Sequence, residues 1–365
     1  MLGKSMTYNS KDILIEIDYS TWTGSVPTNL KGKSGYSSFD MLEVLIHIGL
    51  ATRHPEQLGI SVNDFWAFLR YVNCFLEGSD FRLNEKWQDV DPHQKTILSD
   101  DFGMGFASYY LTKHMNLISF VDTGYFLKHI PSLLISNRSK RGPSKTPDFI
   151  MLDSSFEMHL LECKGTQSSI KNLDKQIESG LPQKNNLRDP KRIISEKLVT
   201  GIFIPQYNSA TNAAFKIIDP EFTLDFNEVD KEDLIIRALQ GQFSKELHML
   251  NLTKFGNEVA NKDKLEDIKI SNIVELLTNE KENTYEQQDI ENDVGIKWTV
   301  GYDLKLFKKL QLSGIDNLLE LFIDMYQSKN DFNNAYKSDI NRGSNIISYK
   351  SLFGLEIEVE ILLQN

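Results

Sequence analysis

The sequence predicts an α/β fold in which a mixed central sheet is flanked by helices. Between residues 98 and 218 the patterns follow the order helix, strands, strand hairpin, helix, strand, strand. The helical segments repeat apolar residues at helical spacing, whereas the strand segments are short apolar runs. A hairpin joined to a further strand by a helix crossover produces both antiparallel and parallel pairs. This order therefore predicts an α/β sandwich.

The composition is that of an ordinary globular protein. The chain has 365 residues, of which 40% are hydrophobic and 25% are charged. This length predicts two or more domains with well-buried cores. We expect an N-terminal α+β extension (1–97), an α/β core (98–227) and a mostly helical C-terminal region for recognition, regulation or oligomerisation (228–365).

The individual elements follow from periodicity and from turn signals. In the first part we expect a strand over 13–17 and helices over 39–50 and 62–76. The core is expected to hold a helix over 99–114, strands near Phe120 and Leu133, the hairpin 147–161, a helix over 167–180, and strands over 197–205 and 213–218. Beyond 228 we expect helix to about residue 260, a mobile charged connection over 279–293, a strand over 297–302, a helix over 315–327 and a hairpin over 346–363.

Several features favour the cytoplasm. The apolar runs are too short to span a bilayer, and the N-terminus lacks the apolar core of a signal peptide. The two cysteines, Cys74 and Cys163, have sequence contexts typical of a core, which suggests a reducing compartment. No Cys/His cluster has zinc spacing, and no phosphate-binding glycine loop of the Walker type occurs. We expect a cytoplasmic protein without a membrane partner.

The charge distribution is uneven along the chain. The net charge of −11 argues against a general polyanion binder, because nucleic-acid affinity depends on phosphate neutralisation. Residues 131–216, however, contain 13 Lys and Arg against 8 Asp and Glu, whereas residues 217–300 contain 9 against 19. A duplex responds to the local charge within a screening length. Nucleic acid is therefore compatible with one face only.

The hairpin holds the strongest chemical pattern in the sequence. Asp148 follows Pro147 at the head of one apolar strand, and the next strand ends in Glu162, Cys163 and Lys164. Because strand side chains alternate, Glu162 and Lys164 project to the same face. Pairing of the strands would bring Asp148 towards them. Two carboxylates and one amine in one patch are typical of a metal-and-water site.

Pro147-Asp148 followed by Glu162-x-Lys164 resembles the signature of the PD-(D/E)XK, or restriction endonuclease-like, nuclease superfamily. The resemblance covers roughly residues 98–218 and implies the restriction endonuclease-like core. It implies that Asp148, Glu162 and the backbone carbonyl of Cys163 bind Mg²⁺, with Mn²⁺ as a substitute. Lys164 would orient or deprotonate the attacking water, or stabilise developing charge on phosphorus. The alternative is a surface hairpin with an ordinary Glu/Lys edge pair.

Two further positions follow from the resemblance. The family often places an acid on the preceding helix, where Asp100 and Asp101 stand; we prefer Asp101 because Gly103 and Gly105 permit close packing nearby. The alternative is that both acids only complement the helix dipole. Some family branches use a glutamine after the lysine, and Gln167 is the best placed here. The alternative for Gln167 is a solvated helix face.

A basic loop precedes Asp148. It carries four cations and no acid, and is either a phosphate-contacting segment or a solvated loop. By strand parity, Glu157 and His159 face away from the expected site. The four candidate nucleic-acid-binding residues of the loop are Arg138, Lys140, Arg141 and Lys145.

The expected function is a Mg²⁺-dependent endonuclease that hydrolyses DNA phosphodiesters. The wider role, a restriction or phage-defence effector with a partner protein, follows from fold-level analogy. Cutting a duplex favours a homodimer. The alternatives are a catalytically silent module of the same fold that binds nucleic acid or a partner, and an RNA-directed nuclease.

Overall fold

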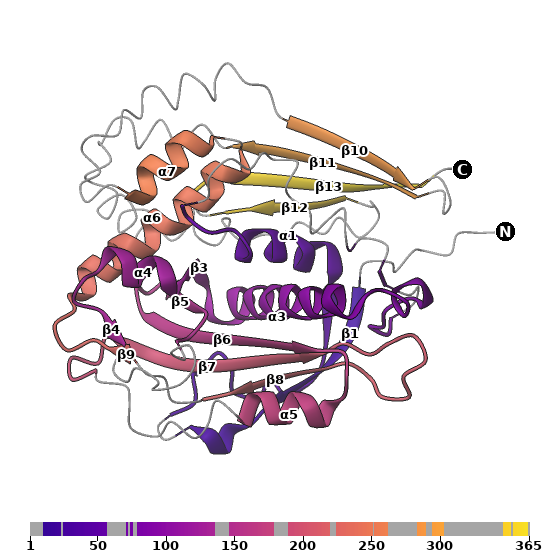
Figure 1. Cartoon of the computed structure of the whole chain (residues 1–365), viewed down its shortest axis with the longest axis horizontal. Coiled ribbons are helices and arrows are strands. Elements are labelled where there is room, and N and C mark those ends of the chain that lie inside the picture. Colours follow the sequence, from indigo (N-terminus) through magenta and orange to yellow (C-terminus); the bar gives the residue numbers. More distant parts are fainter. Residues whose placement is uncertain are drawn as a thin grey trace. The chain divides into compact units, whose positions relative to one another are not determined.

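The computed structural model describes residues 10–22, 25–56, 71, 74–75, 79–135, 146–178, 189–219, 224–250, 252–261, 283–289, 294–302, 346–351 and 353–363. The chain divides into two compact units. Unit 1 comprises 1–54 and 66–238, and unit 2 comprises 55–65 and 239–365. Figure 1 labels their helices and strands.

Unit 1 is built on a seven-stranded mixed sheet, as the fold class predicted. Its strand order is β2-β1-β8-β7-β6-β5-β3. The β1–β8 and β6–β7 pairs are parallel and the other four are antiparallel. The strands are β1 (Ser10–Ile17), β2 (Gly35–Asp40), β3 (Leu117–Asp122), β5 (Phe149–Asp153), β6 (Met158–Thr166), β7 (Ile194–Phe203) and β8 (Ala214–Ile218).

Helices cover both faces of this sheet, as Figure 1 shows. On one face lies α3 (Pro92–Met115), which also packs against α1 (Met41–Ala51). On the other face, α5 (Ile170–Glu178) buries Leu173 and Ile177 against the backbone of Gly201 on β7. Smaller elements complete the unit: η1 (Tyr19–Thr21), η3 (Glu85–Trp87), α4 (Thr123–His129), and the two-stranded pair β4 (Leu134–Ile135) and β9 (Leu224–Asp225).

Local sequence explains where α3 begins and ends. The Asp91 carboxylate caps its first turn by accepting a 2.8 Å hydrogen bond from the His93 N–H, and Pro92 occupies the first position. Asn116 ends the helix in a left-handed conformation with φ 54°. The buried side of α3 carries Phe102 and Phe106, whose rings pack with other core aromatics. The helix also packs against β6, through Gly103 of α3 and Gly165 of β6.

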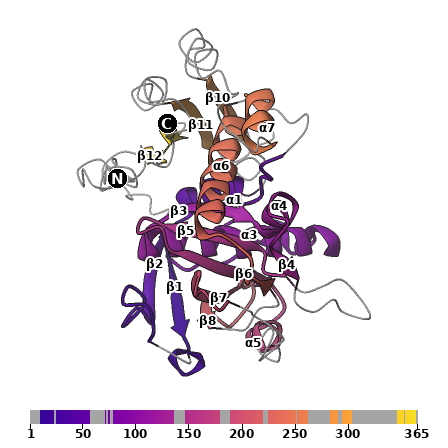
Figure 2. The same cartoon turned by 90° about the vertical axis from the view of Figure 1, so that its left-hand side faces the viewer.

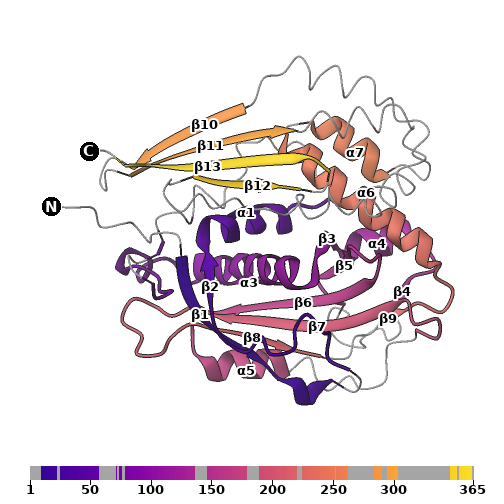
Figure 3. The same cartoon turned by 180° about the vertical axis from the view of Figure 1, so that it is seen from behind.

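Unit 2 contains helices and a second sheet. The helix α6 (Lys231–Met249) contributes residues to both units, and α7 (Thr253–Asn261) follows it. Four antiparallel strands lie side by side in the order β10-β11-β13-β12, visible in Figure 3. They are β10 (Asn283–Asp289), β11 (Val294–Tyr302), β12 (Ile346–Lys350) and β13 (Leu355–Leu363).

Most of the expected elements that fall on described residues are present, with two differences. Residues 1–97 do not stand apart, because β1 and β2 belong to the same sheet as the hairpin strands, as Figure 2 also shows. The segment 279–293 is not simply a mobile connection, because 283–289 forms β10 and pairs along its whole length with β11. An edge strand needs only one neighbour and tolerates a polar sequence. The helices expected over 62–76 and 315–327 lie outside the described residues, apart from 71, 74 and 75.

Within the part of the chain that the structure describes, no helix has both the length and the apolar character needed to cross a bilayer.

Candidate functional site

The β5–β6 hairpin brings the motif residues to one end of two neighbouring strands. Phe149 lies opposite Leu161 in the antiparallel register, so one further step places Asp148 opposite Glu162. Along β6, partly exposed Glu162 and Lys164 alternate with buried Cys163. Side chains of paired residues share a face of the sheet. Asp148, Glu162 and Lys164 therefore lie together on one face.

That face is the one covered by α5. Lys164 is in register with Gly201 of β7, and a Cβ atom at Gly201 would point at Leu173 and Ile177 of α5. The next residue of β6, Gly165, faces α3 instead, since a Cβ there would meet Ser99. The alternation expected from sequence thus holds on β6.

Two short contacts organise the site. The Lys164 ammonium donates a hydrogen bond to the Glu162 carboxylate and forms an ion pair with it. The backbone N–H of Cys163 donates to Oδ2 of Asp148 over 2.8 Å. A charged acceptor shortens and strengthens such a bond. Both carboxylates are therefore held by groups of β6 itself.

The Glu162 carboxylate affects the protonation of Asp148. Desolvation of the carboxyl group by surrounding protein and the negative charge of Glu162 raise the pKa of Asp148 to about 6. The residue as a whole is nevertheless exposed. The Cys163 N–H and the Lys164 charge act in the opposite direction. Repulsion between two nearby acids is relieved when a cation binds between them. The arrangement therefore fits a divalent metal.

The lysine is held in its charged form. Burial alone would lower its pKa, but the charge and hydrogen bond of Glu162 outweigh burial and raise the pKa of Lys164 above its usual value. In this state the amine donates hydrogen bonds and stabilises negative charge. It has no free electron pair with which to take a proton.

On the preceding helix, the structure favours Asp100 over Asp101. Burial raises the pKa of Asp100 while the charge of Lys164 lowers it, and Asp100 in turn raises the pKa of Asp148. Asp101 instead accepts a hydrogen bond from the Tyr71 hydroxyl. Asp101 was preferred because Gly103 and Gly105 would permit close packing near it. Gly103 packs on the Lys164 backbone, and the residue three positions earlier, Asp100, shares that side of the helix.

Gln167 links separate elements, and its hydrogen bonds go to residues other than Lys164. Its amide donates to the Lys95 carbonyl over 2.9 Å and to the Ser99 hydroxyl over 3.2 Å, and its carbonyl accepts from Gln206. It thereby fixes the end of β6 against α3. The neighbouring candidates of the basic loop, Arg138, Lys140, Arg141 and Lys145, lie outside the described residues.

At this site, the groups of the described residues that could bind Mg²⁺ are all oxygen atoms. Asp148 and Glu162 supply carboxylates, and the Cys163 carbonyl would add a backbone oxygen, which matches the ligand preference of this ion. No group of three or more His, Cys, Asp or Glu side chains in the described ranges is arranged as a metal site. The expected set contains two such side chains, and a Mg²⁺ site completed by water and phosphate needs no more.

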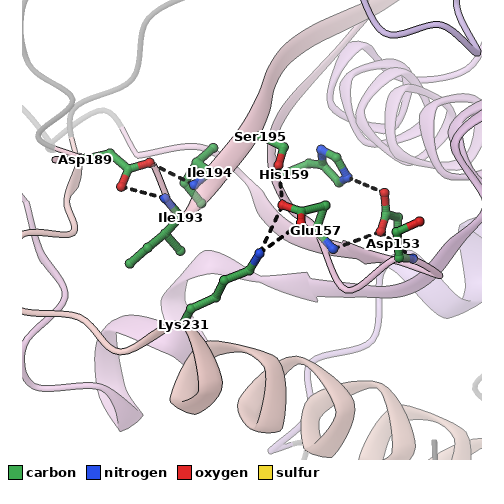
Figure 4. Close-up of polar contacts among 9 residues, drawn as sticks. Asp153, Glu157, His159, Asp189, Ile193, Ile194, Ser195 and Lys231 are labelled. Atoms are coloured by element: carbon green, nitrogen blue, oxygen red, sulfur yellow. Dashed lines mark hydrogen bonds and ion pairs between the residues drawn. The ribbon is translucent and has the colours of Figure 1, made fainter. Parts of the chain in front are cut away.

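The opposite end of the hairpin has a structural role. As Figure 4 shows, Glu157 accepts hydrogen bonds from Ser195 over 2.6 Å and from Lys231 over 3.0 Å. His159 contacts the Asp153 carboxylate at 3.2 Å, and Asp153 also accepts from the Glu157 N–H. These contacts tie the turn to β7 and to the start of α6. They lie at the turn end of the hairpin, away from Glu162 and Lys164.

A cleft of about 570 Å³ lies on the same side of the sheet, over β1 and β8. Lys216 stands in it and forms ion pairs with Glu16 at 3.0 Å and with Asp174 at 2.6 Å. Asp18 and Glu178 also line the cleft. With four carboxylates against one amine, the cleft disfavours phosphate.

Comparison of the chain with protein-family models, with curated proteins and with solved structures finds no match.

Proposed function

We propose that this chain is a Mg²⁺-dependent nuclease with a restriction endonuclease-like core that hydrolyses DNA phosphodiesters. The observation that carries the proposal is the grouping of Asp148, Glu162 and Lys164 at one end of one hairpin. A cationic amine beside two acids that repel each other is an arrangement suited to a metal and an anionic substrate. A merely structural edge pair would not need the second carboxylate.

In the proposed reaction the oxygen of a water molecule forms a bond to phosphorus, and the bond from phosphorus to one sugar oxygen breaks. The water loses a proton to solvent, and the leaving oxygen gains one. When bound, Mg²⁺ would supply neutralisation of phosphate charge and a more acidic water. Asp148, Glu162 and the Cys163 carbonyl would hold it.

Lys164 stabilises the negative charge that grows on the phosphate oxygens. Its raised pKa favours this role, or orientation of the water, over that of a general base. Asp100 adds a third acid near the amine and helps to hold water at the site. The Cys163 N–H keeps the Asp148 carboxylate in place before substrate binds.

DNA is proposed as the substrate on the basis of charge. The local excess of Lys and Arg over residues 131–216 surrounds the motif, and the four cations of the basic loop directly precede Asp148. Such residues position a phosphate backbone without reading its sequence. A homodimer would present two sites to the two strands of a duplex. The role as a restriction or phage-defence effector with a partner protein rests on fold-level analogy.

The test incubates the wild-type chain with plasmid DNA, single-stranded DNA and RNA. Each reaction contains Mg²⁺, Mn²⁺ or a chelator, and Asp148→Ala is run beside the wild type. Metal-dependent cutting of DNA that Asp148→Ala loses would support the proposal. Binding of DNA without cutting would identify a binding module, and cutting of RNA alone would change the substrate class. Cutting that Asp148→Ala retains would contradict the assigned site.

A further inference from the structure

We infer that Pro147 is a positioning residue that keeps the carbonyl oxygen of Cys163 available to a metal ion. The inference rests on the proposed function, because it concerns the same metal site. It explains why a proline, which lacks an N–H group, stands directly before the metal-binding aspartate.

Extended two residues beyond the end of β5, the strand register puts Pro147 opposite Cys163. The last described pairs of the hairpin are Ile150 with Leu160 and Phe149 with Leu161, and two further residues along each strand bring 147 opposite 163. In an antiparallel pair, alternate residues exchange two hydrogen bonds: each N–H donates to the carbonyl of the residue opposite. Whether residues 147 and 163 form a hydrogen-bonded pair therefore depends on whether the N–H and C=O of Cys163 point towards β5.

Those groups point towards β5. The Cys163 N–H donates to the Asp148 carboxylate on that strand. The N–H and C=O of one strand residue face the same neighbour, so the Cys163 carbonyl also faces β5. Adjacent residues agree with this alternation: the Glu162 carbonyl faces β7, where it accepts from the Thr200 hydroxyl over 3.5 Å, and the Asp148 carbonyl faces away from β6 and accepts from the Thr123 N–H over 3.0 Å.

Position 147 would complete the ladder if it held any residue other than proline. Such a residue would donate its N–H to the Cys163 carbonyl, a bond worth about 1 kcal/mol. Pro147 is buried, and its ring fixes its backbone φ. The ladder therefore lacks the hydrogen bond to the Cys163 carbonyl, which leaves that oxygen to the metal.

The test measures binding of Mn²⁺ in the absence of nucleic acid, by electron paramagnetic resonance, to the full-length wild type and to Pro147→Ala. The new amide should weaken Mn²⁺ binding by about tenfold or more, the size of effect seen when groups around metal ligands are changed. The matched control carries lactic acid at position 147, which has the alanine side chain and an ester oxygen in place of the N–H. The control should bind Mn²⁺ more tightly than Pro147→Ala and close to the wild type.

The outcomes separate this inference from the proposed function. Equal Mn²⁺ affinities of Pro147→Ala and the wild type would overturn the inference while leaving the nuclease intact. Equal weakening by Pro147→Ala and by lactic acid would also overturn it, because the ring rather than the N–H would then matter. Absence of Mn²⁺ binding by the wild type would overturn both. If a thermal unfolding assay shows that Pro147→Ala does not fold, the variant with lactic acid at position 147 is compared with the wild type instead. Weaker Mn²⁺ binding by that variant would overturn the inference.

Discussion

Gly165 of β6 lies so close to Ser99 of α3 that a Cβ atom at 165 would stand 1.8 Å from the Ser99 carbonyl oxygen. Real Cβ atoms do not approach backbone oxygen to this distance, so α3 and β6 touch through their main chains here. The contact is flanked by Asp100 on the helix and Lys164 on the strand. It therefore sets how far the Asp100 carboxyl group lies from the Lys164 amine.

Gly165→Ala should destabilise unit 1 by about 3 kcal/mol, because the added methyl forces the helix and the strand apart. Chemical denaturation followed by circular dichroism measures the loss. Gly124→Ala is the control: no atom lies within 4 Å of a Cβ at that helical position, so it should be neutral or up to about 1 kcal/mol stabilising. Equal stability of the two variants would contradict the close packing.

Asp100→Asn and Asp101→Asn should separate catalysis from stability. Asp100 interacts with Lys164 and Asp148, so we expect Asp100→Asn to lower the single-turnover cleavage rate about tenfold with little change in stability. Asp101 holds the Tyr71 hydroxyl, so Asp101→Asn should cost about 1 kcal/mol of unfolding free energy and leave the rate nearly unchanged. The reverse pattern would return the catalytic assignment to Asp101.

Glu246 should make the stability of unit 2 depend on pH. Burial raises its pKa from 4.5 to about 8, while hydrogen bonds from Ser351 and Gln242 partly oppose the rise. The folded state then binds a proton that the unfolded state has released. Its stabilising contribution is complete below pH 4.5 and is lost as the pH rises to about 8.

Glu246→Gln should remove this dependence. The difference in unfolding free energy between variant and wild type should grow between pH 5 and 8.5, by up to about 5 kcal/mol. Urea denaturation at a series of pH values measures it. Curves that run parallel for wild type and Glu246→Gln would show that Glu246 is ionised in the folded state.

Much of unit 1 could be predicted from the sequence because its elements are strongly periodic. Apolar periodicity predicts secondary structure directly. Such patterns occur in the hairpin, in the helix at 99–114 and in the strands at 13–17, 197–205 and 213–218. The entry of β1 between β2 and β8 could not be predicted, because strand order depends on pairings far apart in sequence. Strand alternation likewise predicted that Glu162 and Lys164 share a face.

The choice between Asp100 and Asp101 illustrates what sequence reasoning missed. Adjacent helical residues point about 100° apart, so which of the two acids lies nearer Lys164 depends on which side of α3 meets β6. Gly103 marks that side, and counting back three residues would have selected Asp100. The contacts of Gln167 could not be predicted for another reason. Its partners Lys95 and Gln206 come from separate segments, and no local sequence pattern predicts contacts between residues so far apart in the chain.

The most direct test of the nuclease proposal is the single-turnover rate of plasmid cleavage in Mg²⁺ by Lys164→Ala. The control is Lys171→Ala, which removes an exposed lysine of α5 and leaves the net charge of the two variants equal. We predict that Lys164→Ala loses at least about two orders of magnitude in rate, the scale expected for loss of one charge-stabilising group, while Lys171→Ala cuts like the wild type. Cleavage by Lys164→Ala at the wild-type rate would contradict the proposal.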